Sequence, residues 1–146
     1  MVKKKTEKKE ESKQTNVVHV SGTRKRSIAR ATLKEGRGRI KINNYLLDNY
    51  EPEFARAKIM EPLMIAGDLS NKVDIKINVH GGGWRSQSDA VRLAISRALV
   101  KYSKDKALEK SFLDYDRHLL VADIRRKEQR KPNDSKARAM RTKSYR

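Results

Sequence analysis

The sequence contains no cysteine and no long apolar run. Without cysteine, disulfides, thiolate metal sites and cysteine nucleophiles are excluded. No apolar run approaches the roughly 20 residues that a membrane-spanning helix needs. The N-terminal segment is charged, which argues against a signal peptide, and Glu7, Glu10 and Glu11 argue against a transit peptide. We therefore expect a cytoplasmic protein that has no membrane partner.

Residues suited to catalysis are also scarce. The three histidines, His19, His80 and His118, do not share the spacing of a metal site, such as i, i+4 on one helix. A histidine in or beside a strand is far more often a surface or hydrogen-bonded residue than a catalytic one. We predict no catalytic residue, no metal ion, no cofactor and no small-molecule substrate.

Carboxylates are half as numerous as cations, with 18 Asp and Glu against 36 Lys and Arg, which gives a net charge of +18. Residues 1–41 carry 14 basic and 4 acidic side chains, residues 42–120 carry 12 and 11, and residues 121–146 carry 10 and 3. A solubilising surface would mix both signs along the chain. Basic ends on a nearly neutral centre indicate arms that bind a nucleic acid, either RNA or DNA.

Five segments have the composition or alternation of strands. They are residues 17–20, 27–34, 39–42, 73–79 and 118–122. Strict alternation in the fourth predicts one buried face. The second and third flank a stretch that contains two glycines, and are predicted to pair as a hairpin.

Three segments have the composition or periodicity of helices: residues 49–66, 87–102 and 104–113. The first is predicted to consist of two pieces, because Pro52 and Pro62 both suit a first helical turn, and to end before Gly67. In the second, Ser86 and Asp89 resemble a capping box.

The helix at 87–102 also carries the clearest apolar stripe of the chain. Arg92, Ser96 and Arg97 are predicted to point away from this stripe. The pattern as a whole predicts a small α+β domain at residues 17–122, whose sheet is covered by helices on one face, and the family resemblance described below implies that this sheet is mixed. Residues 1–16 are predicted to be a disordered extension and residues 123–146 an extended basic tail.

Gly81, Gly82 and Gly83 lie between a predicted strand and a predicted helix. Glycines there let backbone amides approach a phosphate at the helix N-terminus. A P-loop needs Lys-Ser or Lys-Thr after its last glycine, whereas Trp84 and Arg85 follow here, which disfavours a mononucleotide pocket. Two interpretations stay open: a tight turn that needs positive φ, and a site for an RNA backbone phosphate with Arg85 beside it.

A second candidate site is a run of three cations between two predicted strands, Arg24, Lys25 and Arg26. In the predicted hairpin, Arg37 and Arg39 would lie near Arg30 at the same end of the sheet. This clustering predicts a phosphate-binding patch.

The tail is the strongest indication of nucleic-acid binding. Its cations are Arg125, Arg126, Lys127, Arg130, Lys131, Lys136, Arg138, Arg141, Lys143 and Arg146. Tyr145 is its only aromatic residue, so neutralisation of the backbone matters more than base stacking. An arginine-rich segment that becomes ordered on RNA fits this pattern, although composition leaves DNA open.

Three ordered blocks resemble the universal family of the ninth small-subunit ribosomal protein (S-nine). The first block is Gly22 followed by Arg24-Lys25 and Ala29-Arg30. The second is Val79-His80-Gly81-Gly82-Gly83 with the following helix. The third is Asp123-Ile124-Arg125-Arg126-Lys127-Glu128, then Lys136-Ala137-Arg138, then Lys143-Ser144-Tyr145-Arg146. That ending is similar to the archaeal and eukaryotic branch, and the resemblance covers residues 17–146.

The resemblance implies a left-handed βαβ crossover and a domain seated on rRNA in the head of the small subunit, beside other ribosomal proteins. It implies that the tail threads between rRNA helices and that its last residue, Arg146, reaches the peptidyl-site tRNA, with Lys143 and Tyr145 beside it. One departure is residues 131–135, which are more polar than the glycine-containing stretch usual in the family.

Two rival functions differ in class. A DNA-compacting chromatin protein usually dimerises, and no dimer seam is evident in the sequence. A small-molecule kinase shares the fold that the resemblance implies, but it needs a carboxylate pair for Mg²⁺, and only Asp89 is near the glycine loop.

Overall fold

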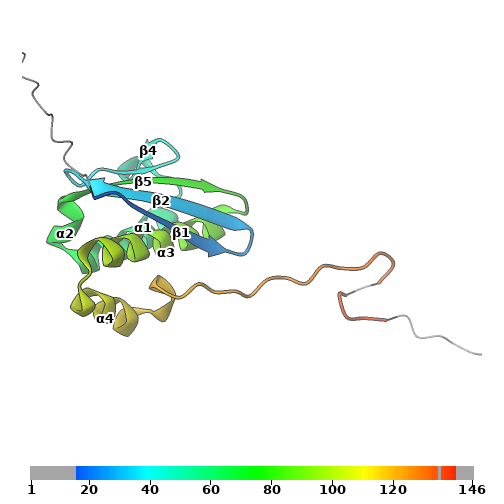
Figure 1. The fold of residues 1–146 in the computed structure, drawn as a ribbon. Helices are drawn as coiled ribbons and strands as arrows, with labels where there is room; N and C mark the ends of the chain where they lie inside the picture. The colour runs from blue at the N-terminus through cyan, green and yellow to red at the C-terminus, as the bar shows by residue number, and fades with distance from the viewer. Residues whose placement is uncertain (1–15, 135, 141–146) are drawn as a thin grey trace, which may run out of the picture.

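The structure, a computed structural model, describes residues 16–134 and 136–140. They form one mixed sheet of five strands with helices on one face, which confirms the predicted α+β class (Figure 1). The strands are β1 (Val18–Arg24), β2 (Ser27–Glu35), β3 (Ile40–Ile42), β4 (Tyr45–Leu46) and β5 (Val73–His80). The helices are η1 (Leu47–Asn49), α1 (Glu53–Ala66), α2 (Asp68–Asn71), α3 (Trp84–Ser103), α4 (Lys106–Tyr115) and η2 (Arg117–Leu119).

The strand order is β1-β2-β5-β3-β4, so the predicted hairpin between 27–34 and 39–42 is wrong. β5 lies between these strands, antiparallel to β2 and parallel to β3. Asp74 of β5 holds the connection, because its Oδ1 accepts hydrogen bonds from the amides of Arg37 and Arg39, both at 2.9 Å. β3 and β5 are parallel and are connected through α1. This βαβ connection corresponds to the crossover that the resemblance implies to be left-handed.

The first hairpin is tighter than the sequence suggested. β1 pairs with β2 from Val18 to Arg24, leaving only Lys25 and Arg26 in the turn, so the predicted loop around these cations is largely strand. Lys25 has a φ of 54°, as a two-residue hairpin turn requires.

The core lies between the sheet and α3. Alternate residues of β2 and β5, such as Leu33, Ile75 and Ile77, are buried against α3, which also packs on β1. Each such side chain, when fully buried, contributes about 1.5–3 kcal/mol. α3 approaches β1 closely at Gly22, where an added Cβ would lie 2.8 Å from the amide nitrogen of Ala94.

Of two predictions for the first helical segment, one is wrong and one is confirmed. α1 is continuous through Pro62, so the predicted break is wrong, while Gly67 caps the helix as expected. Ile59 and Pro62 are both buried, and the stabilisation from this burial offsets the loss of the hydrogen bond that proline cannot donate.

Three predictions about α3 and the following segment are wrong. α3 begins at Trp84 with Gly83 as its N-cap and has no side-chain cap, so Ser86 and Asp89 form no capping box. Arg92 and Ser96 are buried instead of pointing away. The predicted last strand, 118–122, is a 3-10 turn followed by irregular chain.

Buried Arg92 is held by two carboxylates from other elements. Its Nη1 donates to Asp116 Oδ2 at 2.7 Å, and its Nη2 forms an ion pair with Glu61. Burial would raise the pKa of Asp116, but the amide of His118 and the Arg92 guanidinium hold this pKa below its usual value. This network ties α1, α3 and η2 together.

Beyond Leu120 the described chain contains no helix or strand; it first follows the domain as far as the first hairpin and then runs away from it (Figure 1). The predicted disordered extension, residues 1–16, lies outside the described residues except for Asn16. Within residues 16–134 and 136–140, no helix is both long and apolar enough to span a bilayer.

Candidate nucleic-acid interface

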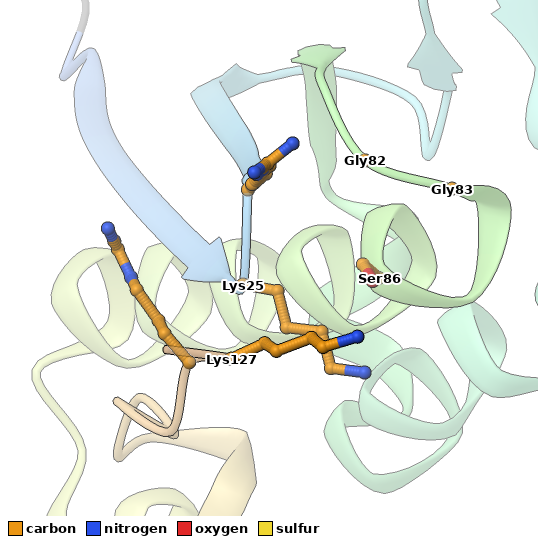
Figure 2. A pocket seen from close by; sticks show the side chains of 7 residues that line it. Lys25, Gly82, Gly83, Ser86 and Lys127 are labelled. Carbon is orange, nitrogen blue, oxygen red and sulfur yellow. The ribbon is translucent and has the colours of Figure 1, made fainter. Parts of the chain in front are cut away.

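The first hairpin, the glycine loop and the start of the tail meet around one depression of about 490 Å³, which we call the hairpin pocket. Its lining residues are Lys25, Arg26, Gly82, Gly83, Ser86, Arg126 and Lys127. Four of the seven are cations and none is acidic. In Figure 2, the side chains of Lys25 and Lys127 extend toward the same side of the view and end below Ser86. The pocket therefore suits an anion.

The glycine loop is a tight turn that other residues would strain. Gly81 and Gly82 have φ values of 76° and 67°. A Cβ on Gly81 would lie 2.5 Å from the carbonyl oxygen of Arg26, and one on Gly82 would collide with Ser27 Oγ. Ser27 Oγ donates to the carbonyl oxygen of Gly81 at 2.8 Å, fixing the loop to the hairpin. The turn interpretation is confirmed, and the phosphate interpretation stays open beside it.

The N-terminus of α3 reinforces the positive potential of the hairpin pocket. No side chain caps the helix at Gly83, so the first-turn amides have no side-chain acceptor among the described residues. No acidic residue lies in the first turn. The helix dipole therefore adds to the field of the four cations.

Arg24 fixes the start of the tail against the domain. Its guanidinium lies 3.3 Å from Asp123 Oδ2 and 3.7 Å from Asp89 Oδ2, and donates to the carbonyl oxygen of Arg125 at 3.4 Å. Arg97 acts similarly, donating to the carbonyl oxygen of Leu120 at 2.9 Å. The first tail residues are thereby directed into the hairpin pocket.

The carboxylate of Asp123 lies between two guanidinium groups. Hydrogen bonds from Arg125, together with the charge of Arg24, hold its pKa well below the usual value. Only 8% of its side chain is exposed. Arg24 and Arg125 thus serve to position the tail.

The other predicted cations of the domain are not gathered in one patch. Lys25 and Arg26 lie at the hairpin end of the sheet, whereas Arg37 and Arg39 lie at the opposite end beside Asp74, so their predicted clustering is wrong. Arg30 is exposed in the middle of β2, paired with Asn78 of β5. Arg85 does not line the hairpin pocket, but lies beside it with its guanidinium carbon 5.2 Å from the centroid of the Trp84 ring. Their binding to RNA stays a prediction.

Further along the tail, Lys127 and Arg130 line a second depression of about 510 Å³ together with Arg26. Arg138 donates to Glu128 Oε2 at 2.9 Å, which lowers the pKa of this carboxyl. Lys131 and Lys136 are exposed. The predicted contacts Arg141, Lys143, Tyr145 and Arg146 lie outside the described residues.

The polar stretch of residues 131–135 forms a turn in its described part. The amide of Asp134 donates to the carbonyl oxygen of Lys131 at 3.3 Å, and Asn133 has a φ of 65°. Among residues other than glycine, asparagine tolerates this left-handed conformation best. Asn133 can thus replace a glycine at this bend.

The geometry offers little to an enzyme. Asp89 is engaged by Lys58 and Arg24, and the hairpin pocket has no carboxylate among its lining residues. Across residues 16–134 and 136–140, no group of three or more His, Cys, Asp or Glu side chains is placed to hold a metal ion. His19 contacts Thr32 at 3.0 Å, and His118 contacts Asp116 at 3.1 Å.

Sequence reasoning missed Asp123 as the partner of Arg24 and missed Ser86 as a lining residue of the hairpin pocket. The only local signal for Asp123 was an arginine two residues later, and the partner 99 positions earlier is evident only from the fold.

Comparisons with a family model and with individual known proteins all indicate the same family. The family model described as ribosomal protein S9/S16 matches residues 22–146. The small ribosomal subunit protein uS9 of Methanothrix thermoacetophila is 48% identical over 130 residues, covering 89% of this chain and 98% of that protein. The uS9 protein of Methanococcus maripaludis is 48% identical over 132 residues, with the same two coverages.

Proposed function

Because this chain belongs to the ribosomal protein S9/S16 family, we propose that it is a structural, non-catalytic protein of the small ribosomal subunit that binds rRNA through the hairpin pocket and the tail. The observation that carries this proposal is the convergence of four cations from two distant segments. Lys25 and Arg26 come from the hairpin, and Arg126 and Lys127 from the tail, around a glycine turn and a helix N-terminus.

This arrangement favours a phosphate of the RNA backbone over a free nucleotide. A nucleotide enzyme would need carboxylates for Mg²⁺, and none lines the pocket. Backbone amides and cations recognise phosphate without reading a base. The tail continues the same chemistry along the strand, because Arg130, Lys131 and Lys136 are exposed beyond the pocket.

The proposal predicts a loss of salt-dependent rRNA affinity in the triple variant Lys25→Gln, Arg26→Gln, Lys127→Gln. Each lost phosphate contact lowers the slope of log K against log[salt] by about 0.7, so this slope should become shallower by about 2. A filter-binding titration with purified small-subunit rRNA measures it.

The matched control is Lys101→Gln, Lys106→Gln, Lys110→Gln, which removes three exposed charges at the far end of α3 and on α4. Its slope should stay near that of the wild type. If both variants lost the same amount of slope, or if the wild type bound duplex DNA of matched length as tightly as rRNA, the binding would be unspecific charge attraction and the proposal would be wrong.

From the family resemblance, we further propose that the end of the tail contacts the peptidyl-site tRNA through Lys143, Tyr145 and Arg146. The domain would bind the head of the subunit beside neighbouring ribosomal proteins. A guanidinium can bind a tRNA phosphate in a bidentate manner, and one such contact contributes about 1–3 kcal/mol when desolvated.

Deletion of Ser144, Tyr145 and Arg146 should leave subunit assembly intact and speed tRNA dissociation from the peptidyl site severalfold. The measurement is the tRNA off-rate from purified subunits that carry the full-length or the shortened protein. If both kinds of subunit released tRNA at the same rate, the tail would contact rRNA but not tRNA.

A further inference from the structure

The face of the sheet that no helix covers carries cations from three neighbouring strands. They are Arg30 and Lys34 of β2, Lys76 of β5, Lys41 of β3, and Arg39, which directly precedes β3. Four of them, all but Arg30, line a depression of about 380 Å³ together with Thr32, Asn44, Asp74 and Ile75. Within residues 16–134 and 136–140, none of the five cationic groups has a carboxylate within ion-pair distance.

Charge is segregated between the two layers of the domain. Asp74 is the only one of the eleven carboxylates between residues 42 and 120 that lies on a strand, and the one other carboxylate on a described strand, Glu35, ends β2 on the alternation of the buried residue Leu33. The Oδ1 of Asp74 accepts hydrogen bonds from the amides of Arg37 and Arg39, and its single negative charge faces five cations. The other ten lie on the helices or their connections.

The register places like charges side by side. Lys41 of β3 is the direct neighbour of Lys76 in β5, and Lys76 in turn neighbours Thr32 of β2. Adjacent strands are about 4.8 Å apart, and neighbouring like charges on a sheet cost stability. An ordinary solvated face needs no such arrangement, whereas a bound polyanion would offset the repulsion.

From this surface we infer that the open face of the sheet binds the sugar–phosphate backbone of an RNA duplex. The inference rests on the RNA binding proposed above and adds a second contact surface to it. Lys34, Lys41 and Lys76 would neutralise phosphates, while Thr32 and Asn78 offer groups that can bond to 2′-hydroxyls.

The face suits a duplex better than single-stranded RNA or a peptide. Tyr45, on the short strand β4, is the only Phe, Tyr or Trp residue on the strands of this sheet, so there is no row of such rings on which bases could stack. An extended peptide usually joins the edge of a sheet through backbone hydrogen bonds and does not lie across its face.

This surface and the hairpin pocket contact different parts of the RNA. From Ile28 to Lys34, β2 spans roughly 20 Å, and the pocket lies beyond the Ile28 end on the side of α3. The domain would therefore lie between two stretches of RNA backbone.

The test compares two full-length triple variants by hydroxyl-radical footprinting on purified small-subunit rRNA. Lys34→Gln, Lys41→Gln, Lys76→Gln should lose one set of protected nucleotides and bind at least about tenfold more weakly at low salt. Lys25→Gln, Arg26→Gln, Lys127→Gln should lose a different set. The charge-conserving variant Lys34→Arg, Lys41→Arg, Lys76→Arg should restore the first set, which separates charge from folding.

An unchanged footprint for the open-face variant, with a changed one for the pocket variant, overturns this inference and leaves the proposed function intact. Unchanged footprints for both overturn the two together. If the open-face variant keeps its rRNA footprint but assembled subunits lose a neighbouring protein, the surface binds protein and the inference is also overturned.

Discussion

Substitution of Gly22 by alanine tests whether the close approach of α3 to β1 sets the stability of the domain. The new Cβ would lie 2.8 Å from the amide nitrogen of Ala94 and closer still to the carbonyl oxygen of Ala90. Both atoms belong to the backbone of the helix that packs against β1, β2 and β5, so no side chain can simply rotate away. The helix must shift as a body.

Overpacking of this kind costs about 1–3 kcal/mol, and we expect the upper half of this range. For an ordered domain of about 100 residues, 1 kcal/mol lowers the melting temperature by about 4 °C, so a fall of roughly 8–12 °C should be seen by circular dichroism.

Gly83→Ser is the matched control, because Gly83 has no neighbour within 4 Å of an added Cβ and serine is a favoured N-cap residue. Its melting temperature should stay within about 2 °C of the wild type. A similarly small change for Gly22→Ala would refute the argument, because it would mean that α3 moves away from β1 at no cost.

Three further perturbations test charged side chains and the groups that bind them. Arg92→Met should lower the free energy of unfolding in urea by about 2–3 kcal/mol, because it leaves two carboxylates facing each other, and Arg92→Lys should lose less; equal losses would count against the charge argument. Asp123→Asn should leave the melting temperature unchanged but speed tryptic cleavage after Arg125, since the tail loses its attachment to Arg24; unchanged cleavage would rule out this role. Because its two backbone hydrogen bonds lower the pKa of Asp74 in the folded state, its contribution to stability is full above about pH 4 and disappears as the pH falls through the lowered value. Asp74→Asn should therefore flatten the decline of the urea midpoint below pH 4, and parallel declines would contradict this assignment.

Much of the domain was predictable because its local signals are strong. The alternation of β5 reflects one buried face, and β5 and α3 lie close to where the sequence placed them, although α3 begins at Trp84 and is buried all round from Ala90 to Ser96. The glycine loop was likewise recognisable, since positive φ at Gly81 and Gly82 is required locally.

The strand order was not predictable in this way. Nothing near residues 27–42 indicates that the strand Val73–His80 inserts between β2 and β3. The alternation does turn Lys34, Lys41 and Lys76 outward, but their proximity depends on that order. Burial of Arg92 was missed because its two acidic partners come from other elements.

The position of β5 in the middle of the sheet also determines the order in which the chain can fold during synthesis. The β1–β2 hairpin is local and can form early, within microseconds of its release. β2 and β3 have no common neighbour until Val73–His80 has emerged, so two strand edges stay unpaired through the first half of translation. Closure of the sheet is then a late, non-local event, and the rate of folding should depend on residues of β5 more than on those of the hairpin.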